Sequence, residues 1–297
     1  MTFELSKLMN HLYEGIYTVD LERKIISWNI AAEEITGFKA DEVIGKYCHD
    51  NILNHIDAEG RLLCLNGCPL HTTLKDGVER EAYLFLQHKK GYRIPVKLKT
   101  VPIIENDVLI GVAELFQLNN EVEKTIDTLL HDSSAIERDA ITGLPMRAYM
   151  EQFLAHMATL NRTLNLSFGI ILVDIDSFEE FNNTYGKRLG DDVLKIISKT
   201  FTSVFGHAEM IGRWRQDEFL FVFSSLSKEQ LFSTAETIRM LSEGSALRNA
   251  TFKDVDVTVS IGATHYLKQE TIDNMIMRAY DNLKASKRKG GNFVTMK

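Results

Sequence analysis

Hydrophobic and polar positions alternate over the first 118 residues in short runs that are typical of β-strands. Two runs within residues 15–28 are separated by a polar turn at residues 20–24. Further strands are predicted at residues 82–87, 93–104 and 108–117, and short helices at residues 31–36, 41–43 and 70–75. This pattern predicts a small α+β domain, residues 1–118, that is built on an antiparallel sheet.

Between residues 119 and 140 the pattern changes to one helical seam. Apolar or small residues recur there at alternating spacings of four and three, at Val122, Ile126, Leu129, Ser133, Ile136 and Ala140. Such a heptad seam favours a parallel coiled coil between two copies, and the alternative is a linker helix that packs on its own protein.

From residue 141 to residue 297, amphipathic segments alternate with apolar runs. Helices are predicted at residues 147–160, 178–184, 191–204, 228–242 and 271–287. Strands are predicted at residues 167–175, 210–214, 219–223, 255–263 and 293–296. This order predicts a second domain, an α/β sandwich.

Composition narrows the class of protein. The chain has 297 residues, a formal net charge of −7 and a hydrophobic fraction of 44%, which suits globular domains and argues against a dedicated nucleic-acid binder. The densest apolar stretch, residues 168–173, is far shorter than the roughly 20 residues of a membrane span. The first fifteen residues lack the apolar region of a secretory signal, so we expect a cytoplasmic protein with no membrane insertion.

Two pairs of acidic residues stand at predicted strand ends. Asp174 and Asp176 end the fully apolar run at residues 168–176, and Asp217 and Glu218 lie in a turn between two apolar strands. If the two strand ends approach each other, their carboxylates can hold Mg²⁺ through oxygen ligands. The same residues can equally be loop acids, one of which caps the next helix.

Five blocks of this second domain resemble the GGDEF, or diguanylate cyclase, domain. Residues 138–147 (RDAITGLPMR) resemble its RDxLTGLxNR opening, and residues 174–191 resemble its DIDxFKxINDxxGHxxGD block. Residues 213–219 (RWRQDEF) stand at its RYGGDEF signature, and residues 257–262 and 278–292 resemble its closing blocks. The blocks are ordered and correctly spaced, and together they are far more specific than any one of them.

The resemblance implies a palm-like nucleotidyl cyclase fold that condenses two GTP into cyclic di-GMP, one GTP in each domain of a dimer. Metal-assisted attack of a ribose 3′-hydroxyl on an α-phosphate is the implied chemistry. By position, the resemblance assigns Mg²⁺ or Mn²⁺ to Asp174, the carbonyl of Ile175 and Asp217. It assigns Glu218 to a second metal or to the 3′-hydroxyl, so Asp217 and Glu218 are the implied catalytic acids.

The resemblance also implies a GTP-binding set. Asn182 and Asp191 match the guanine readers, because a carboxylate and an amide can both pair with the edge of that base. Lys287 matches a phosphate-binding lysine, and Phe178 belongs to the same block as Asn182. These four residues are the expected substrate-binding residues.

Four positions depart from the family pattern in this pocket. Arg215 and Gln216 replace the two glycines of the signature, where the family's backbone approaches the nucleotide closely. Glu179 stands where the family has a lysine, and Gly291 stands where it has an arginine. The alternatives are therefore a weak cyclase and a catalytically inactive domain that binds GTP or a partner protein as a regulatory scaffold. A cyclase with another nucleotide choice is disfavoured by Asp191.

Residues 3–118 resemble a PAS sensor domain through GIYTVD (15–20), ISWNIAAEEITG (26–37) and EVIG (42–45). The resemblance implies a five-stranded antiparallel sheet, a sensory role and pairing as a dimer. Because cyclic di-GMP is two-fold symmetric, we expect a homodimer through the PAS domain and the linker helix, with GTP as the ligand of the output domain.

The PAS-like segment contains all three cysteines of the chain, Cys48, Cys64 and Cys68, together with His71. Three thiolates and one imidazole can satisfy a tetrahedral Zn²⁺, and thiolates also suit an Fe–S centre. The alternatives are small buried residues beside an incidental histidine, or a redox pair of Cys64 and Cys68.

Overall fold

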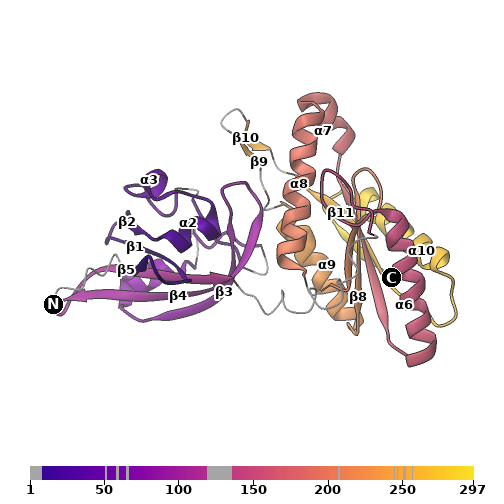
Figure 1. Cartoon of the computed structure of the whole chain (residues 1–297), viewed down its shortest axis with the longest axis horizontal. Helices are drawn as coiled ribbons and strands as arrows, with labels where there is room; N and C mark the ends of the chain where they lie inside the picture. The colour runs from indigo at the N-terminus through magenta and orange to yellow at the C-terminus, as the bar shows by residue number, and fades with distance from the viewer. Residues whose placement is uncertain are drawn as a thin grey trace. The chain divides into compact units, whose positions relative to one another are not determined.

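The computed structural model describes residues 9–50, 52–57, 60–64, 67–118, 136–206, 208–243, 245, 247–249, 252–255 and 257–297. Residue contacts divide the chain into two compact units, residues 1–120 and 121–297 (Figure 1). Most of the linker helix predicted at residues 119–140 falls on residues 119–135 and so lies outside the described residues. No helix within the described ranges is both long and apolar enough to cross a membrane.

The N-terminal unit is built on a five-stranded antiparallel sheet with the strand order β2-β1-β5-β4-β3. Its strands are β1 (Gly15–Val19), β2 (Ile25–Trp28), β3 (Arg80–Gln87), β4 (Arg93–Glu105) and β5 (Val108–Leu118). Its helices are α2 (Ile30–Thr36), α3 (Ala40–Val43) and α4 (Pro69–Asp76). The antiparallel α+β architecture predicted from the sequence is confirmed, and every predicted element lies within two residues of an observed one.

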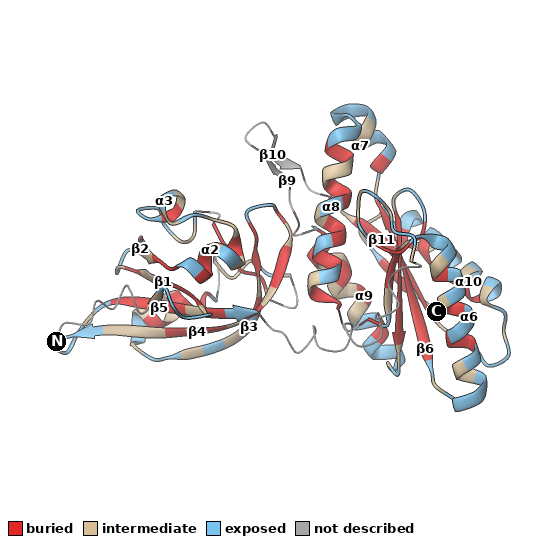
Figure 2. Ribbon diagram, in the orientation of Figure 1, coloured by how far each residue is buried: buried red, intermediate tan, exposed pale blue. Residues whose placement is uncertain are grey.

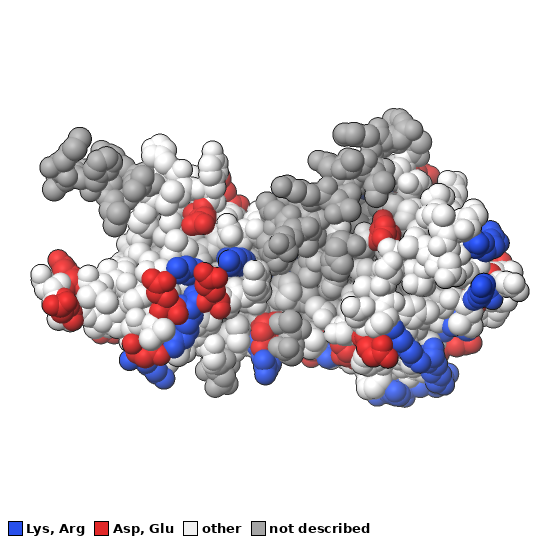
Figure 3. Space-filling model, turned by 90° about the horizontal axis from the view of Figure 1, so that it is seen from below, with Lys and Arg blue, Asp and Glu red and all other residues white. Residues whose placement is uncertain are grey.

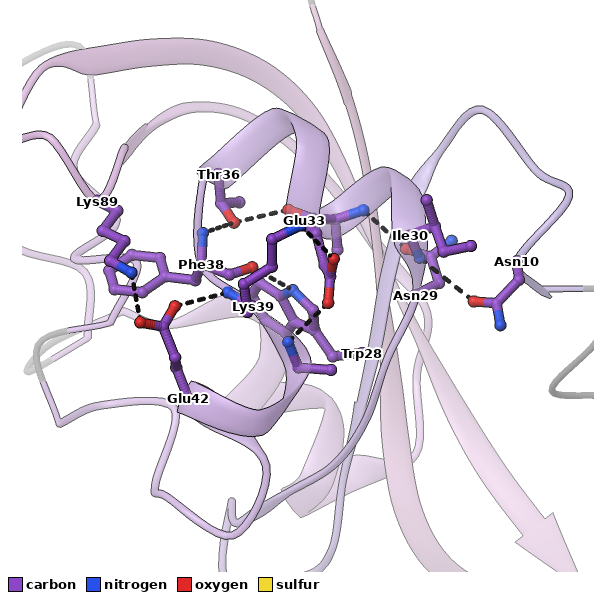
Figure 4. Close-up of polar contacts among 12 residues, drawn as sticks. Asn10, Trp28, Asn29, Ile30, Glu33, Thr36, Phe38, Lys39, Glu42 and Lys89 are labelled. Carbon is purple, nitrogen blue, oxygen red and sulfur yellow. Dashed lines mark hydrogen bonds and ion pairs between the residues drawn. The ribbon is translucent and has the colours of Figure 1, made fainter.

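Polar contacts fix the corner between β1, α2 and α3. The side-chain oxygen of Asn29 accepts hydrogen bonds from the N–H groups of Ala32 and Ile16, both at 2.8 Å, and so caps α2 while it ties the helix to β1. Glu33, in the first turn of α2, places Oε2 2.8 Å from Nζ of Lys39, which follows the helix, and Glu42 accepts from the Lys39 N–H at 2.8 Å (Figure 4). The short helices are therefore held by side-chain contacts, because few internal hydrogen bonds are available to so few residues.

The outer face of this sheet combines ion pairs with exposed apolar side chains such as Tyr83, which lies opposite Lys97. Cross-strand ion pairs join Lys97 to Glu81 at 3.2 Å and Lys99 to Glu79 at 2.8 Å between β3 and β4. Figure 3 shows acidic and basic side chains intermixed on the face of this unit that is seen from below. The described residues of that face therefore form no continuous basic stripe of the kind that binds nucleic acid.

The C-terminal unit has a second five-stranded sheet, with the order β12-β11-β6-β8-β7. Its strands are β6 (Phe168–Ile175), β7 (Met210–Arg213), β8 (Glu218–Ser224), β11 (Val259–His265) and β12 (Val294–Met296). Its helices are α6 (Arg147–Leu164), α7 (Phe178–Tyr185), α8 (Lys187–Val204), α9 (Lys228–Glu243) and α10 (Ile272–Arg288). All eight residues of β6 are buried, and Figure 2 shows this strand among the helices.

Both faces of this sheet are covered by helices. Leu172 and Leu220 pack in one cluster with Leu154 of α6 and Leu283 of α10. On the opposite face, the ring of Phe201 on α8 meets the rings of Phe219 and Phe221 at 5.3 and 4.9 Å. Burial on both faces explains why β6 and β8 read as continuous apolar runs in the sequence.

Three boundaries of this unit differ from the sequence prediction. α6 continues to Leu164 and ends where Asn165 adopts φ 55°, and α8 begins at Lys187, just after Gly186 with φ 88°. The strand predicted at residues 255–263 is instead β11, and a short hairpin of β9 (Leu247–Asn249) and β10 (Phe252–Val255) precedes it. The hairpin was missed because these short, mixed segments carry no clear alternation.

Candidate functional site

Two buried acids lie side by side at the ends of neighbouring strands. In the antiparallel register of β6 and β8, Asp174 is opposite Glu218. Residues directly opposite each other share one face of a sheet, so both carboxyl groups lie on the side that α6 and α10 cover. Asp174 is 5% exposed and Glu218 is 8% exposed. The structure therefore brings together two of the acids that the sequence singled out.

Helix α10 supplies a partner to each of these acids. Lys287 Nζ lies 2.7 Å from Asp174 Oδ1, and Tyr280 Oη donates a hydrogen bond to Glu218 Oε2 at 2.5 Å. Tyr280 and Lys287 are seven positions apart, about two helical turns, which places both on one face of the helix. Lys287, predicted as a phosphate-binding residue, thus contacts a predicted metal ligand in this structure.

Burial governs the protonation of this site. The pKa of Asp174 is raised to about 6: burial raises it most, the contact with Lys287 opposes this rise, and the negative charges of Asp217 and Glu218 add to it. Burial together with the Glu218 carboxylate also raises the pKa of the Tyr280 phenol well above its usual range. Tyr280 therefore stays a neutral hydrogen-bond donor to Glu218.

The signature turn between β7 and β8 is tied to the segment before α6. Arg213 Nη1 lies 2.7 Å from Asp139 Oδ1, and Asp139 in turn accepts a hydrogen bond from the Thr142 N–H at 2.8 Å. The turn itself is closed by the Trp214 N–H, which donates to the Glu218 carbonyl at 2.8 Å. The two motif blocks at residues 138–147 and 213–219 thus act as one structural unit.

Arg215, which replaces a signature glycine, lies beside Glu218 and over the Tyr280 ring. Its Nε is 3.7 Å from Glu218 Oε2, and its guanidinium carbon stands 5.1 Å from the centre of the Tyr280 ring. Trp214 Nε1 donates to Tyr280 Oη at 3.1 Å and so orients the phenol. Tyr280 and Trp214 were not singled out from the sequence, because neither residue type carries a motif of its own there.

Asp217 and Ile175 lie beside the two buried acids. The Ile175 N–H donates to the Asp217 carbonyl at 3.2 Å, which links the ends of β6 and β8. The Asp217 side chain is half-buried. Across the described part of the chain, no group of three or more His, Cys, Asp or Glu side chains is arranged to hold a metal ion. A divalent cation here would thus need further ligands from a backbone carbonyl, water or a substrate.

The predicted guanine readers lie near the junction of α7 and α8. Asn182 Oδ1 is buried and has no hydrogen-bond partner among the described residues. The Asn182 side chain packs on Gly190, where an added Cβ would lie only 1.9 Å from Oδ1. Asp191 follows Gly190 directly and is half-buried. Phe178, at the start of α7, is buried with its ring parallel to that of Phe181.

Asp176, the second acid at the end of β6, accepts hydrogen bonds from three groups of the protein itself. Its carboxylate accepts from Thr258 Oγ1 at 2.8 Å, Ser260 Oγ at 2.6 Å and the Asn292 N–H at 2.8 Å. Gly291 adopts φ 79°, and a Cβ there would lie 3.2 Å from this carboxylate. Gly291, which departs from the family pattern, therefore lets the backbone pass close to the Asp176 carboxylate. Glu179, the other departure, is exposed in the first turn of α7.

The three cysteines of the N-terminal unit are free thiols in this structure, with Cys68 buried and Cys48 and Cys64 half-buried. Burial raises the pKa of Cys68 to about 11 and also raises the pKa of Cys48 and Cys64. In the metal-free protein these surroundings keep the three cysteines as neutral thiols. The described residues contain no group of three or more metal-binding side chains, so the Zn²⁺ or Fe–S hypothesis for the cysteines and His71 is without support.

A buried acid that the sequence analysis missed lies near these thiols. Glu114 is 1% exposed on the inward face of β5, between Val112 and Phe116. Its Oε1 accepts a hydrogen bond from Tyr17 Oη at 2.9 Å and lies 3.5 Å from His55 Nε2. Glu114 Oε2 and His55 Nε2 have no hydrogen-bond partner among the described residues. The signal in the sequence was an acid at an inward-facing position of an apolar strand.

Comparison with known families agrees with this architecture. The profile of the family described as "Diguanylate cyclase, GGDEF domain" matches residues 136–293, which is more than half of the chain. The chain belongs to this GGDEF-domain family. A PAS-domain profile matches residues 14–117, so a PAS domain precedes the GGDEF domain. The resemblance inferred from the motif blocks is confirmed for both domains.

Individual relatives show the same likeness. The chain is 29% identical over 197 residues to "Diguanylate cyclase DosC" of Escherichia coli, which is 64% of this chain and 43% of that protein. It is 31% identical over 163 residues to "Diguanylate cyclase A" of Treponema denticola, which is 53% of this chain and again 43% of the relative. The chain thus spans less than half the length of these curated relatives.

Solved structures of GGDEF domains superpose on the C-terminal part of the chain. The coiled coil and GGDEF domain of DgcB from Caulobacter crescentus, in complex with c-di-GMP, is 28% identical with a TM-score of 0.51 and covers 60% of this chain and 94% of that one. Diguanylate cyclase SiaD from Pseudomonas aeruginosa, in complex with its activator SiaC, is 25% identical with a TM-score of 0.52 and covers 60% and 67%.

Proposed function

We propose that this protein is a PAS-regulated diguanylate cyclase that condenses two GTP into cyclic di-GMP at a low rate. The observation that carries the proposal is the pair Asp174 and Glu218, which lie opposite each other at the buried ends of β6 and β8 in a domain of the GGDEF family. Two adjacent carboxylates beside a lysine suit a site that manages the charge of a triphosphate.

Each predicted residue has a role in this proposal. Asn182 and Asp191 read the guanine edge, and the partnerless oxygen of Asn182 supports this, since a buried acceptor left unpaired costs free energy until a ligand donates to it. Lys287 binds phosphate, and Phe178 anchors the start of α7. Glu218, with one oxygen held by Tyr280, presents the other toward the reacting 3′-hydroxyl.

Mg²⁺ or Mn²⁺ is the implied cofactor, and the residues present fit it. Mg²⁺ is commonly held by one or two carboxylates together with substrate phosphates. Asp174 and Asp217, with the Ile175 carbonyl, would hold the ion, and Asp174 Oδ1 is a buried carboxylate oxygen whose partner is the flexible side chain of Lys287. When bound, the ion polarises the phosphate and stabilises the charge that develops on it.

The proposal includes a domain order and a dimer. PAS residues 1–118 would regulate GGDEF residues 141–297 through a helix at residues 119–140, and two chains would pair through the PAS domain and this helix. A two-fold symmetric product requires two GTP sites that face each other. Activity should then rise more steeply than in proportion to protein concentration until the dimer is saturated.

Incubation with GTP and Mn²⁺, followed by chromatography of the products, tests the proposal. We expect cyclic di-GMP to form slowly and Asp217→Ala to abolish it, because a proposed ligand of the metal ion is removed. Glu180→Ala, which removes an exposed acid of α7, is the control and should leave the product yield unchanged. Absence of product from wild-type protein at every concentration would exclude the cyclase.

The second candidate is a catalytically inactive domain that binds GTP or a partner protein as a regulatory scaffold. The observation that favours it is Arg215, whose side chain replaces the hydrogen of a signature glycine and lies beside Glu218. Under this alternative, GTP binds without turnover, and Arg215→Gly does not restore product formation.

A further inference from the structure

Each of the two buried acids of the site faces a basic side chain of the same protein. Lys287 Nζ is 2.7 Å from Asp174 Oδ1, and Arg215 Nε is 3.7 Å from Glu218 Oε2. The side chains of the acids are only 8% and 10% exposed, whereas those of Lys287 and Arg215 are 47% and 53% exposed. The basic groups therefore stand between the acids and solvent.

This arrangement opposes the binding of a cation by itself. A divalent ion that approaches Asp174 and Glu218 meets two positive charges at a partly buried position, where charge repulsion is weakly screened. The protein also provides too few converging ligands, since no group of three or more metal-binding side chains occurs within the described residues. Lys287 and Arg215 thus neutralise the two acids in the free protein. The site is not arranged to bind a metal ion in the absence of nucleotide.

The two basic side chains are able to exchange partners. Lys287 reaches its acid from α10 on a flexible side chain, and Arg215 rests on the Tyr280 ring at 5.1 Å. Tyr280 Oη holds Glu218 Oε2 independently at 2.5 Å, so Glu218 keeps a hydrogen bond when the guanidinium turns away. Both ammonium and guanidinium groups bind phosphate oxygens well.

We propose that Lys287 and Arg215 are exchangeable counterions of this site: they neutralise Asp174 and Glu218 in the free protein and transfer to the triphosphate when a divalent cation binds at Asp174 and Asp217, beside Glu218. The exchange conserves charge, because the two unit charges withdrawn from the acids equal the charge of one divalent ion. This inference rests on the proposed GTP site. It makes the binding of metal and the binding of nucleotide depend on each other, so that either ligand alone binds weakly.

Measuring metal binding in the absence of nucleotide distinguishes counterion exchange from a role of Lys287 and Arg215 in phosphate binding alone. We would measure Mn²⁺ binding to the full chain by electron paramagnetic resonance, alone and with GTP whose α–β bridging oxygen is replaced by methylene. Lys287→Met should bind Mn²⁺ alone about tenfold more tightly than wild type, while its affinity for the nucleotide with Mn²⁺ falls about tenfold, within the usual range of coupling between two ligands. Arg215→Met should shift both affinities in the same directions.

Lys289→Met is the matched control, since Lys289 Nζ lies 3.9 Å from the Phe293 ring centre rather than on an acid. It also removes one positive charge near the end of α10 and should change neither affinity. The exchange is overturned if Lys287→Met and Arg215→Met bind Mn²⁺ alone no more tightly than wild type. If wild-type protein binds no nucleotide with Mn²⁺, the proposed function fails instead, and Mn²⁺ binding to the variants still tests the neutralising role.

Discussion

Glu114 and His55 form a fully buried acid–base pair in the PAS domain, with Glu114 Oε1 3.5 Å from His55 Nε2. Burial raises the pKa of Glu114 to about 8, whereas burial and the nearby charge of Arg93 lower the pKa of His55 to about 4. Between these values both side chains are neutral in the folded protein. The pair is thus a carboxylic acid beside a neutral imidazole, with Tyr17 as a hydrogen-bond donor.

The opposite pKa shifts predict an unusual dependence of PAS stability on pH. Above the ordinary pKa of Glu114, 4.5, the unfolded chain releases a proton that the folded domain keeps, so stability falls with rising pH until about pH 8. Below the ordinary pKa of His55, 6.5, only the unfolded chain protonates this residue, so stability rises with pH up to 6.5. The two slopes cancel between pH 4.5 and 6.5, and from pH 6.5 to 8 the Glu114 slope remains, a loss of about 2 kcal/mol.

Glu114→Gln should remove the loss of stability between pH 6.5 and 8, because a neutral amide does not titrate. Urea unfolding followed by Trp28 fluorescence measures it, in a Trp214→Phe background that leaves one of the two tryptophans. Glu105→Gln, which changes an exposed acid on β4, should keep the wild-type slope. An unchanged slope in Glu114→Gln would show that other groups cause it.

The contacts of Asp176 predict a structural role for this acid. Asp176→Ala removes three hydrogen bonds that join the end of β6 to Thr258, Ser260 and Asn292, and should lower the free energy of unfolding of the GGDEF domain by about 2–3 kcal/mol. Thermal or urea unfolding measures the effect. Asp281→Ala, at an exposed position of α10, should be neutral. Equal stability of the two variants would mean that the Asp176 bonds contribute nothing net.

The contact between Gly190 and Asn182 predicts a loss of guanine recognition. In Gly190→Ala the new methyl group would lie 1.9 Å from Asn182 Oδ1, so the amide must leave its position. We expect the affinity for GTP to fall about tenfold, as for other lost base contacts, although alanine is the better helix former. A double-mutant cycle is the control: in Asn182→Ala, adding Gly190→Ala should cost nothing further. Additive losses would contradict a role through Asn182.

The sequence by itself determined the two domains and most elements. β6 and β8 are buried on both faces, so their apolar runs were unambiguous, and the strands of the PAS domain were bounded by clear turn residues. The motif blocks at residues 138–147 and 174–191 were enough to indicate the GGDEF family, because each block holds several residues in fixed spacing.

Only the tertiary structure decided which acids meet and what neutralises them. Asp174 and Glu218 are 44 positions apart, and their pairing depends on the register of β6 with β8. The partners of these acids, Tyr280 and Lys287, come from a helix near the end of the chain. Such contacts leave no local pattern, since a hydrogen bond between distant segments constrains neither periodicity nor composition. For the same reason, Glu114 appeared in the sequence as one acid in a strand, and its burial against His55 became visible only in the fold.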